Sequence, residues 1–182
     1  MVSVEFTRMI SKKFTISDLD LTYSVGISQI HFNCEDFQEK GPLENTEEVL
    51  HELLKIIGEI QKKYSGSVIN LLNDECILNE QHIFKAAYFS LKAFSEEINI
   101  SNQINIELFL YLAADRQIKN AIHAFGLSEE ILDKGYLTYC ILTKKDDLEK
   151  IHLDILNTFD SKELNLYITQ PSGEKLEHIK NF

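Results

Sequence analysis

Short apolar segments of two different periodicities alternate along this chain of 182 residues. Alternation of apolar and polar residues is typical of strands, whereas an apolar residue at every third or fourth position is typical of helices. Strand-like patterns cover residues 21–32, 68–72, 136–143 and 164–168, and helix-like patterns cover residues 46–64, 80–97, 116–125 and 145–159. Because the two kinds alternate without a linker or an internal repeat, we expect a single domain over residues 1–182. Its predicted class is α/β (α+β), with a mixed central sheet of about five strands flanked by helices.

Two stretches are interpreted less directly. In LTYSVGISQIHF, residues 21–32, the apolar positions change parity between Ile27 and Ile30, which predicts a β-bulge near Ser28–Gln29. The segment Ile106–Leu112 is almost wholly apolar and short for a core helix, so we predict that it is a central strand. The last residues, GEKLEHIKNF, favour a final turn or two of helix.

Charge and composition limit the partners of the chain. The formal net charge is −11 and 44% of the residues are hydrophobic, so a substantial core is possible and unspecific binding to nucleic acid or membranes is disfavoured. A local basic patch remains compatible with this balance. The three cysteines, Cys34, Cys76 and Cys140, are widely spaced and lie in or beside apolar stretches. Together with the lack of a segment long enough to span a membrane, they predict a cytoplasmic protein with reduced cysteines.

Sequence signatures of catalysis are missing. The six histidines have no recognised metal-binding spacing, and the chain contains no GxGxxG, GxxxxGK[ST] or GxSxG motif. Asn73-Asp74-Glu75 resembles half of a metal-binding loop but lacks further ligands, which favours a simple turn. We therefore expect no enzyme activity, no catalytic residue, no metal and no cofactor.

The stretch YLAADRQIKNAIHAFGL, residues 111–127, carries the most suggestive cations. Asp115 is well placed to cap a helix that begins at Arg116. Arg116, Lys119 and His123 fall in one narrow sector of that helix, either as an ordinary solvated face or as an anion-binding strip on an acidic protein. On the preceding predicted helix, Lys85 and Lys92 are seven residues apart and could extend the strip.

Two segments resemble a known family. They are NDECILNEQHIFKAAYFSLKAFSE, residues 73–96, and INIELFLYLAADRQIKNAIHAFGLSEE, residues 104–130. Both resemble the kinase-binding subunit of the KEOPS complex, the TPRKB or PRPK-binding family, in its archaeal type, and the resemblance is strongest over residues 67–130. The residues that match the family pattern are Glu107, Arg116, Gln117, Ile118, Ala121, Phe125 and Gly126.

This resemblance implies a non-catalytic accessory subunit. Such a subunit binds the atypical kinase-like ATPase of KEOPS and helps to recruit tRNA by its single-stranded 3′ CCA end, for threonylcarbamoyl modification of an anticodon-loop adenosine. A few cations and some apolar surface suit an unpaired RNA end. The candidate RNA-binding residues are therefore Lys85, Lys92, Arg116, Lys119 and His123.

The resemblance also bears on the end of the chain. Phe182 stands about where the last helix of the family would begin, so that helix is expected to be absent. We predict an exposed apolar patch around Ile179 and Phe182 that binds the kinase or a second copy of the chain, giving a possible homodimer. Two alternatives stay open: a small-molecule-binding or enzymatic α/β domain of unrelated function, and a relative that keeps only its protein partner.

Overall fold

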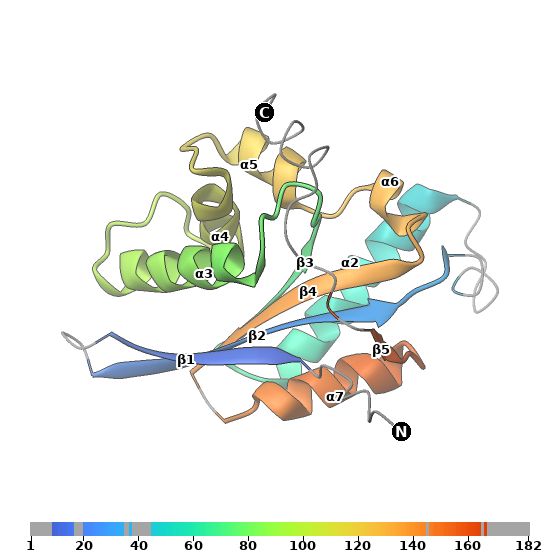
Figure 1. The fold of residues 1–182 in the computed structure, drawn as a ribbon, viewed down its shortest axis with the longest axis horizontal. Coiled ribbons are helices and arrows are strands. Elements are labelled where there is room, and N and C mark those ends of the chain that lie inside the picture. Colours follow the sequence, from blue (N-terminus) through green and yellow to red (C-terminus); the bar gives the residue numbers. More distant parts are fainter. Residues whose placement is uncertain are drawn as a thin grey trace, which may run out of the picture.

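The protein folds into a five-stranded sheet with helices on both faces (Figure 1). The structure is a computed structural model, and it describes residues 9–16, 20–34, 37, 45–144, 146–164 and 166. The strands are β1 (Ile10–Ile16), β2 (Leu21–His31), β3 (Ser67–Leu72), β4 (Tyr136–Thr143) and β5 (Glu163–Leu164). The order is β1-β2-β4-β3, and β5 also pairs with β2. The predicted α+β class and strand number are confirmed. The expected mixed sheet is wrong, because β4 lies between β2 and β3 and every described pairing is antiparallel.

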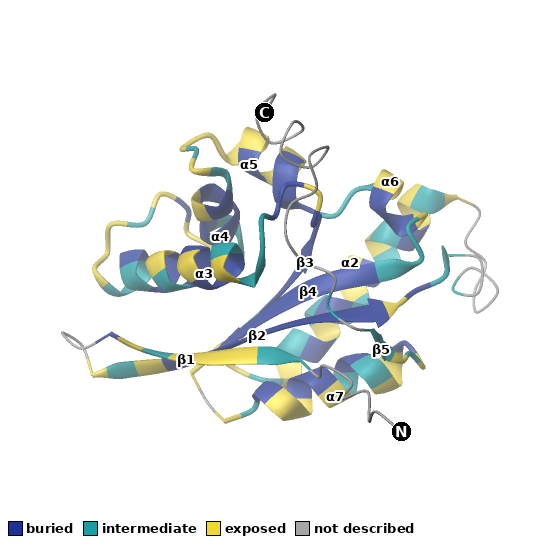
Figure 2. Ribbon diagram, viewed as in Figure 1, coloured by how far each residue is buried: buried dark blue, intermediate teal, exposed yellow. Residues whose placement is uncertain are grey.

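The helices form a layer on each face of the sheet. They are α2 (Thr46–Lys63), α3 (Glu80–Ser95), α4 (Ile104–Ala113), α5 (Ile118–Phe125), α6 (Glu129–Leu132) and α7 (Leu148–Thr158). Buried side chains of α3, α4 and α5 share one core cluster, and those of α2, α6 and α7 share a second one. Figure 2 shows that β2, β3 and β4 are buried between these layers, whereas the outer helix faces and much of β1 are exposed.

Side-chain caps begin two helices where the sequence predicts them. The Asn45 side chain accepts a hydrogen bond from the Glu48 backbone N–H at 2.9 Å, and Asn79 accepts one from the His82 backbone N–H at 3.1 Å. Each bond satisfies a backbone donor that the first helical turn leaves unpaired. These caps set the starts of α2 and α3, and both predicted helices are confirmed.

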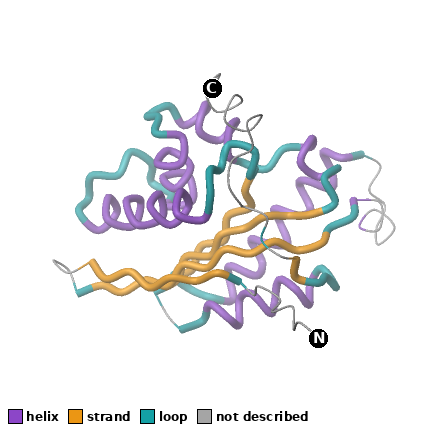
Figure 3. Tube along the Cα trace, viewed as in Figure 1, coloured by secondary structure: helices purple, strands orange, loops and turns teal. Residues whose placement is uncertain are grey.

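The segment Ile106–Leu112 belongs to helix α4, so the predicted central strand is wrong. It is apolar on nearly every side because α4 packs between α3 and α5, and an enclosed helix has no polar face to reveal its period. Figure 3 shows this part of the chain as a helical segment of the three-helix layer. The helix ends at Ala114, whose left-handed backbone, with φ 49°, turns the chain toward α5.

The predicted bulge at Ser28–Gln29 is also wrong, because the register of β2 with β4 continues from Ser24↔Thr143 to His31↔Tyr136. The apolar parity changes for another reason. Helix α7 lies close over the face that carries Gly26, where an added Cβ would be only 2.9 Å from Leu148 Cδ1. The residues on that face are small where the helix lies close, so the large apolar residues of the sequence change sides along β2, although the strand itself is regular.

Strand β1 is missing from the sequence-based expectation because a lysine breaks its apolar alternation. Lys12 lies on the same face as Phe14, with Nζ 5.2 Å from the centre of the Phe14 ring, so its cation covers aromatic surface. At the other end, β5 confirms the start of the predicted last strand through pairing with Gln29 and Ile30. The expected turn of helix in the last ten residues lies outside the described residues.

Candidate functional site

Three of the predicted RNA-binding residues lie at the start and on the surface of α5. Arg116, Lys119 and His123 are all exposed. Arg116 precedes the helix, in the link from α4, and the other two lie one turn apart within it. Within the described part of the chain, neither Arg116 nor Lys119 forms an ion pair, so both cations face solvent.

Asp115 holds the turn before α5. Its carboxylate accepts hydrogen bonds from the Asn120 side chain at 3.0 Å and from the Gln117 backbone N–H at 2.9 Å. These bonds lower the pKa of Asp115, with the Asn120 bond contributing most. The helix begins at Ile118, two residues later than predicted, and Gln117 is its N-cap residue without a side-chain cap. Asp115 therefore supports the turn that leads into α5.

Helix α3 carries the other two predicted residues on one exposed surface. Lys85 is exposed, and Lys92 is half-buried with its Nζ 3.5 Å from Glu96 Oε1. Between them in sequence and on the same side lies Phe89, whose side chain is 48% exposed. Its ring stacks on that of Tyr111 from α4, with centroids 6.0 Å apart. Neither aromatic residue was expected at the site, although the spacing of Phe89 from the two lysines could have indicated it.

The two sets of cations lie on the same side of the sheet. Helix α4 packs against both α3 and α5, and the three helices form one layer (Figure 1). Among the described helices, α3 and α5 therefore do not lie on opposite faces of the sheet, which would have kept their cations apart. That Lys85 or Lys92 reaches one groove together with Arg116 stays a prediction.

A cavity of about 570 Å³ opens between α4, α5 and the start of α3. Its lining includes His82, Asp115 and His123. The His82 ring accepts a hydrogen bond from the Leu78 backbone N–H through Nδ1 and donates one to the Leu112 carbonyl through Nε2. Both ring nitrogens therefore hold backbone groups at the wall of the cavity.

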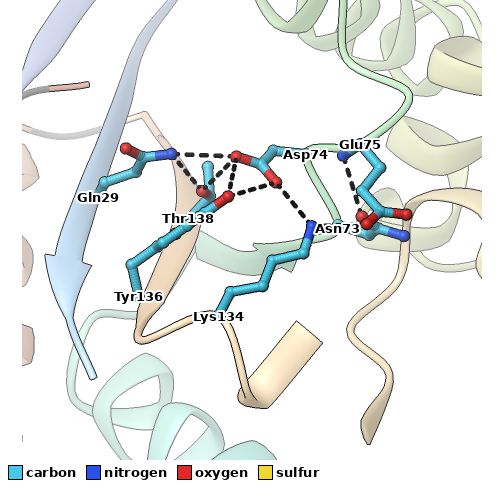
Figure 4. Close-up of polar contacts among 7 residues, drawn as sticks. All are labelled: Gln29, Asn73, Asp74, Glu75, Lys134, Tyr136 and Thr138. Carbon is cyan, nitrogen blue, oxygen red and sulfur yellow. Dashed lines mark hydrogen bonds and ion pairs between the residues drawn. The ribbon is translucent and has the colours of Figure 1, made fainter. Parts of the chain in front are cut away.

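The acidic turn after β3 is held by protein groups (Figure 4). Asp74, which is buried, accepts hydrogen bonds from Gln29 Nε2 at 3.1 Å, Tyr136 Oη at 3.2 Å and Thr138 Oγ1 at 3.4 Å. Lys134 Nζ lies 3.7 Å from Asp74 Oδ1. Burial and then the Asp74 charge raise the pKa of Tyr136 to about 12, so its phenol stays a donor. These contacts tie the turn to β2 and β4, as expected for a structural turn.

Asn73 and Glu75 complete the same turn. The Asn73 side chain accepts a hydrogen bond from the Glu75 backbone N–H at 3.0 Å, and the Glu75 carboxylate lies 2.8 Å from Lys134 Nζ. Among the residues that the structure describes, no group of three or more histidine, cysteine or acidic side chains is arranged to hold a metal ion. In the same residues, no helix has the length and apolar character needed to cross a membrane.

The remaining predicted residues, Ile179 and Phe182, lie outside the described residues. The apolar patch, its use by a kinase and the possible homodimer stay predictions. Within the described residues, Leu153 of α7 is an apolar side chain that is 53% exposed.

An antiparallel α+β domain with exposed cations and aromatic rings on one helical layer defines a class of protein suited to binding other macromolecules. A family model described as kinase binding protein CGI-121 matches residues 42–174, which is more than half of the chain. The chain therefore belongs to the CGI-121 family of kinase-binding proteins, and the resemblance to the kinase-binding subunit of KEOPS is confirmed. A comparison with curated proteins gives no match. The archaeal type stays a prediction.

Proposed function

We propose that this chain is a non-catalytic KEOPS accessory subunit that binds the atypical kinase and helps to recruit tRNA by its 3′ CCA end. The family match over residues 42–174 carries the proposal, because it identifies a kinase-binding protein. In this role the chain contributes to threonylcarbamoyl modification of tRNA in the cytoplasm without reacting itself. None of its three cysteines forms a disulfide, which agrees with a reducing compartment.

The RNA part of the proposal is supported by the surface of the helical layer. Arg116, Lys119 and Lys85 are exposed cations on the same side of the sheet, in a chain whose net charge is −11. A few exposed cations suit a short unpaired RNA end better than a long duplex, because only a few phosphates can be bound.

Charge reversal tests this surface. We expect Arg116→Glu with Lys119→Glu to weaken tRNA binding and to reduce its salt dependence. For each single-strand phosphate that loses its cation, the slope of log K against log salt concentration should become shallower by about 0.7. Titrations at several salt concentrations, with tRNA that carries or lacks the CCA end, measure both effects. Lys55→Glu with Lys62→Glu is the matched control, because these residues lie on α2 in the opposite layer and give the same change of net charge. Equal binding of tRNA with and without CCA would refute the RNA part.

The net charge of −11 favours a second candidate, a relative that keeps only its protein partner. The same titration separates the two. A chain that binds the kinase and shows no affinity for tRNA at low salt is this second kind of protein.

A further inference from the structure

Four aromatic side chains from three elements form a continuous row of ring contacts that runs from β1 past α3 to α4. The row consists of Phe14 on β1, Tyr88 and Phe89 on α3, and Tyr111 on α4. Adjacent ring centroids are 5.7 Å apart for Phe14 and Tyr88, 5.4 Å for Tyr88 and Phe89, and 6.0 Å for Phe89 and Tyr111. The row is continuous, although its members are far apart in the sequence.

The exposed end of this row is the stacked pair of Phe89 and Tyr111. Phe89 is 48% and Tyr111 is 37% exposed, whereas Phe14 and Tyr88 are half-buried beneath the neighbouring elements. The planes of Phe89 and Tyr111 differ by only 21°, so each ring keeps the other in place. Large aromatic side chains usually bury most of their surface, and rings left in solvent in a fixed orientation are typical of a binding surface.

Lysines flank the row on three sides. Lys85 and Lys92 lie one helical turn before and after Phe89, and Lys12 Nζ lies 5.2 Å from the centre of the Phe14 ring. Glu96 pairs with Lys92 at 3.5 Å, which leaves Lys85 and Lys12 as the cations available to a ligand. The Glu107 and Glu96 carboxylates act on Tyr111, so, among the described residues, the unpaired positive charge belongs to the part of the row that contains Phe14 and Phe89.

This combination matches the chemistry of unpaired nucleotides. Every base has a π-face that can stack on an aromatic ring, and every linkage carries a negative phosphate. An apolar protein segment would use the rings but would leave the lysines without partners. A single-stranded RNA end uses both, which is why charge complementarity favours RNA as the occupant.

We infer that Phe89 and Tyr111 are the stacking residues for unpaired bases at the RNA end, with Lys85 and Lys12 directed to the phosphates beside them. The inference rests on the proposed function, since it assigns the base-binding part of the same helical layer. It adds residues on α3, α4 and β1 to a site whose predicted members were all cations or histidine.

The test uses the full chain and an acceptor-stem hairpin with a 3′ CCA overhang, measured by fluorescence anisotropy. We expect Phe89→Ala and Tyr111→Ala each to weaken binding roughly 5- to 150-fold, as removal of a base-stacking ring does. The salt dependence should stay unchanged, because the phosphates keep the cations beside them. Phe89→Trp should retain binding, since an indole also stacks. Leu153→Ala is the matched control, because Leu153 is similarly exposed but lies on α7 in the opposite layer.

The outcomes separate the inference from the proposed function. If the unaltered chain binds the overhang and the Phe89 and Tyr111 variants, folded by circular dichroism, bind it equally well, the stacking residues are wrong and RNA recruitment stands. If the unaltered chain does not distinguish the overhang from a blunt hairpin, recruitment by the unpaired end fails, and the inference fails with it. If the variants lose kinase binding and keep RNA binding, the row is a protein interface and the inference is overturned.

Discussion

At the scale of single residues, buried carboxylates in this protein serve the fold. Glu107 matches the family pattern and is buried, and it accepts hydrogen bonds from the backbone N–H groups of Ile100 and Ser101 at 3.1 and 2.8 Å. Its charge therefore holds the loop before α4. Asp74 does the same for the turn after β3 through Gln29 and Tyr136. A sequence shows a carboxylate but not its hydrogen-bond donors, so these roles could not be predicted from residue type.

Asp74 is the residue with which to test this interpretation. We expect Asp74→Ala to lower the free energy of unfolding by about 1–3 kcal/mol, because Tyr136 and Lys134 lose a buried acceptor. Urea denaturation of both proteins measures the difference. The control is Asp146→Ala, which removes an exposed carboxylate paired with Lys13 and should cost about 0–1 kcal/mol. Equal losses for the two variants would show that the network around Asp74 adds no stability.

At the scale of elements, the sequence predicts best where one side of an element meets water. The amphipathic patterns over residues 46–64 and 80–97 predict α2 and α3 correctly. Prediction fails where tertiary contacts surround an element, as for α4, whose enclosure by α3 and α5 removes the helical period. It fails for β1 because Lys12 lies on the apolar face of the strand, where its cation is stabilised by the Phe14 and Phe84 rings.

The close packing of α7 on β2 gives a prediction at this scale. Gly26→Val should destabilise the protein by about 1–3 kcal/mol, because the new side chain must displace its neighbours. A Cβ at Gly26 would lie 2.7 Å from Met9 Sδ and 2.9 Å from Leu148 Cδ1. Gly58→Val on α2 is the control, since a Cβ there would have no atom within 4 Å apart from the backbone of its own helix and its chain neighbours. Thermal unfolding of both variants measures the difference. A Gly26 variant as stable as the Gly58 variant would mean that α7 can move away from the sheet at little cost.

At the scale of the whole molecule, the topology gathers the candidate site on one of the two helical layers. The antiparallel sheet places α3, α4 and α5 together, so cations separated in the sequence share one side with the exposed rings of Phe89 and Tyr111. The cations of this candidate site could be predicted from the sequence. The rings are harder to predict, because residue type does not tell an exposed aromatic residue in an amphipathic helix from a core residue. Only the spacing of Phe89 from Lys85 and Lys92 indicates that it lies on their side of α3.

The central claim is that the chain binds the KEOPS kinase, and titration of the purified kinase subunit into the purified chain by calorimetry tests it most directly. The account predicts a saturable complex for the unaltered chain. It also predicts loss of that complex, with the fold retained, for Ile179→Asp combined with Phe182→Asp, because charged side chains would disrupt an apolar interface. If this double variant is folded and binds normally, the interface lies elsewhere on the chain. If the unaltered chain gives no complex with the kinase, the central claim is contradicted.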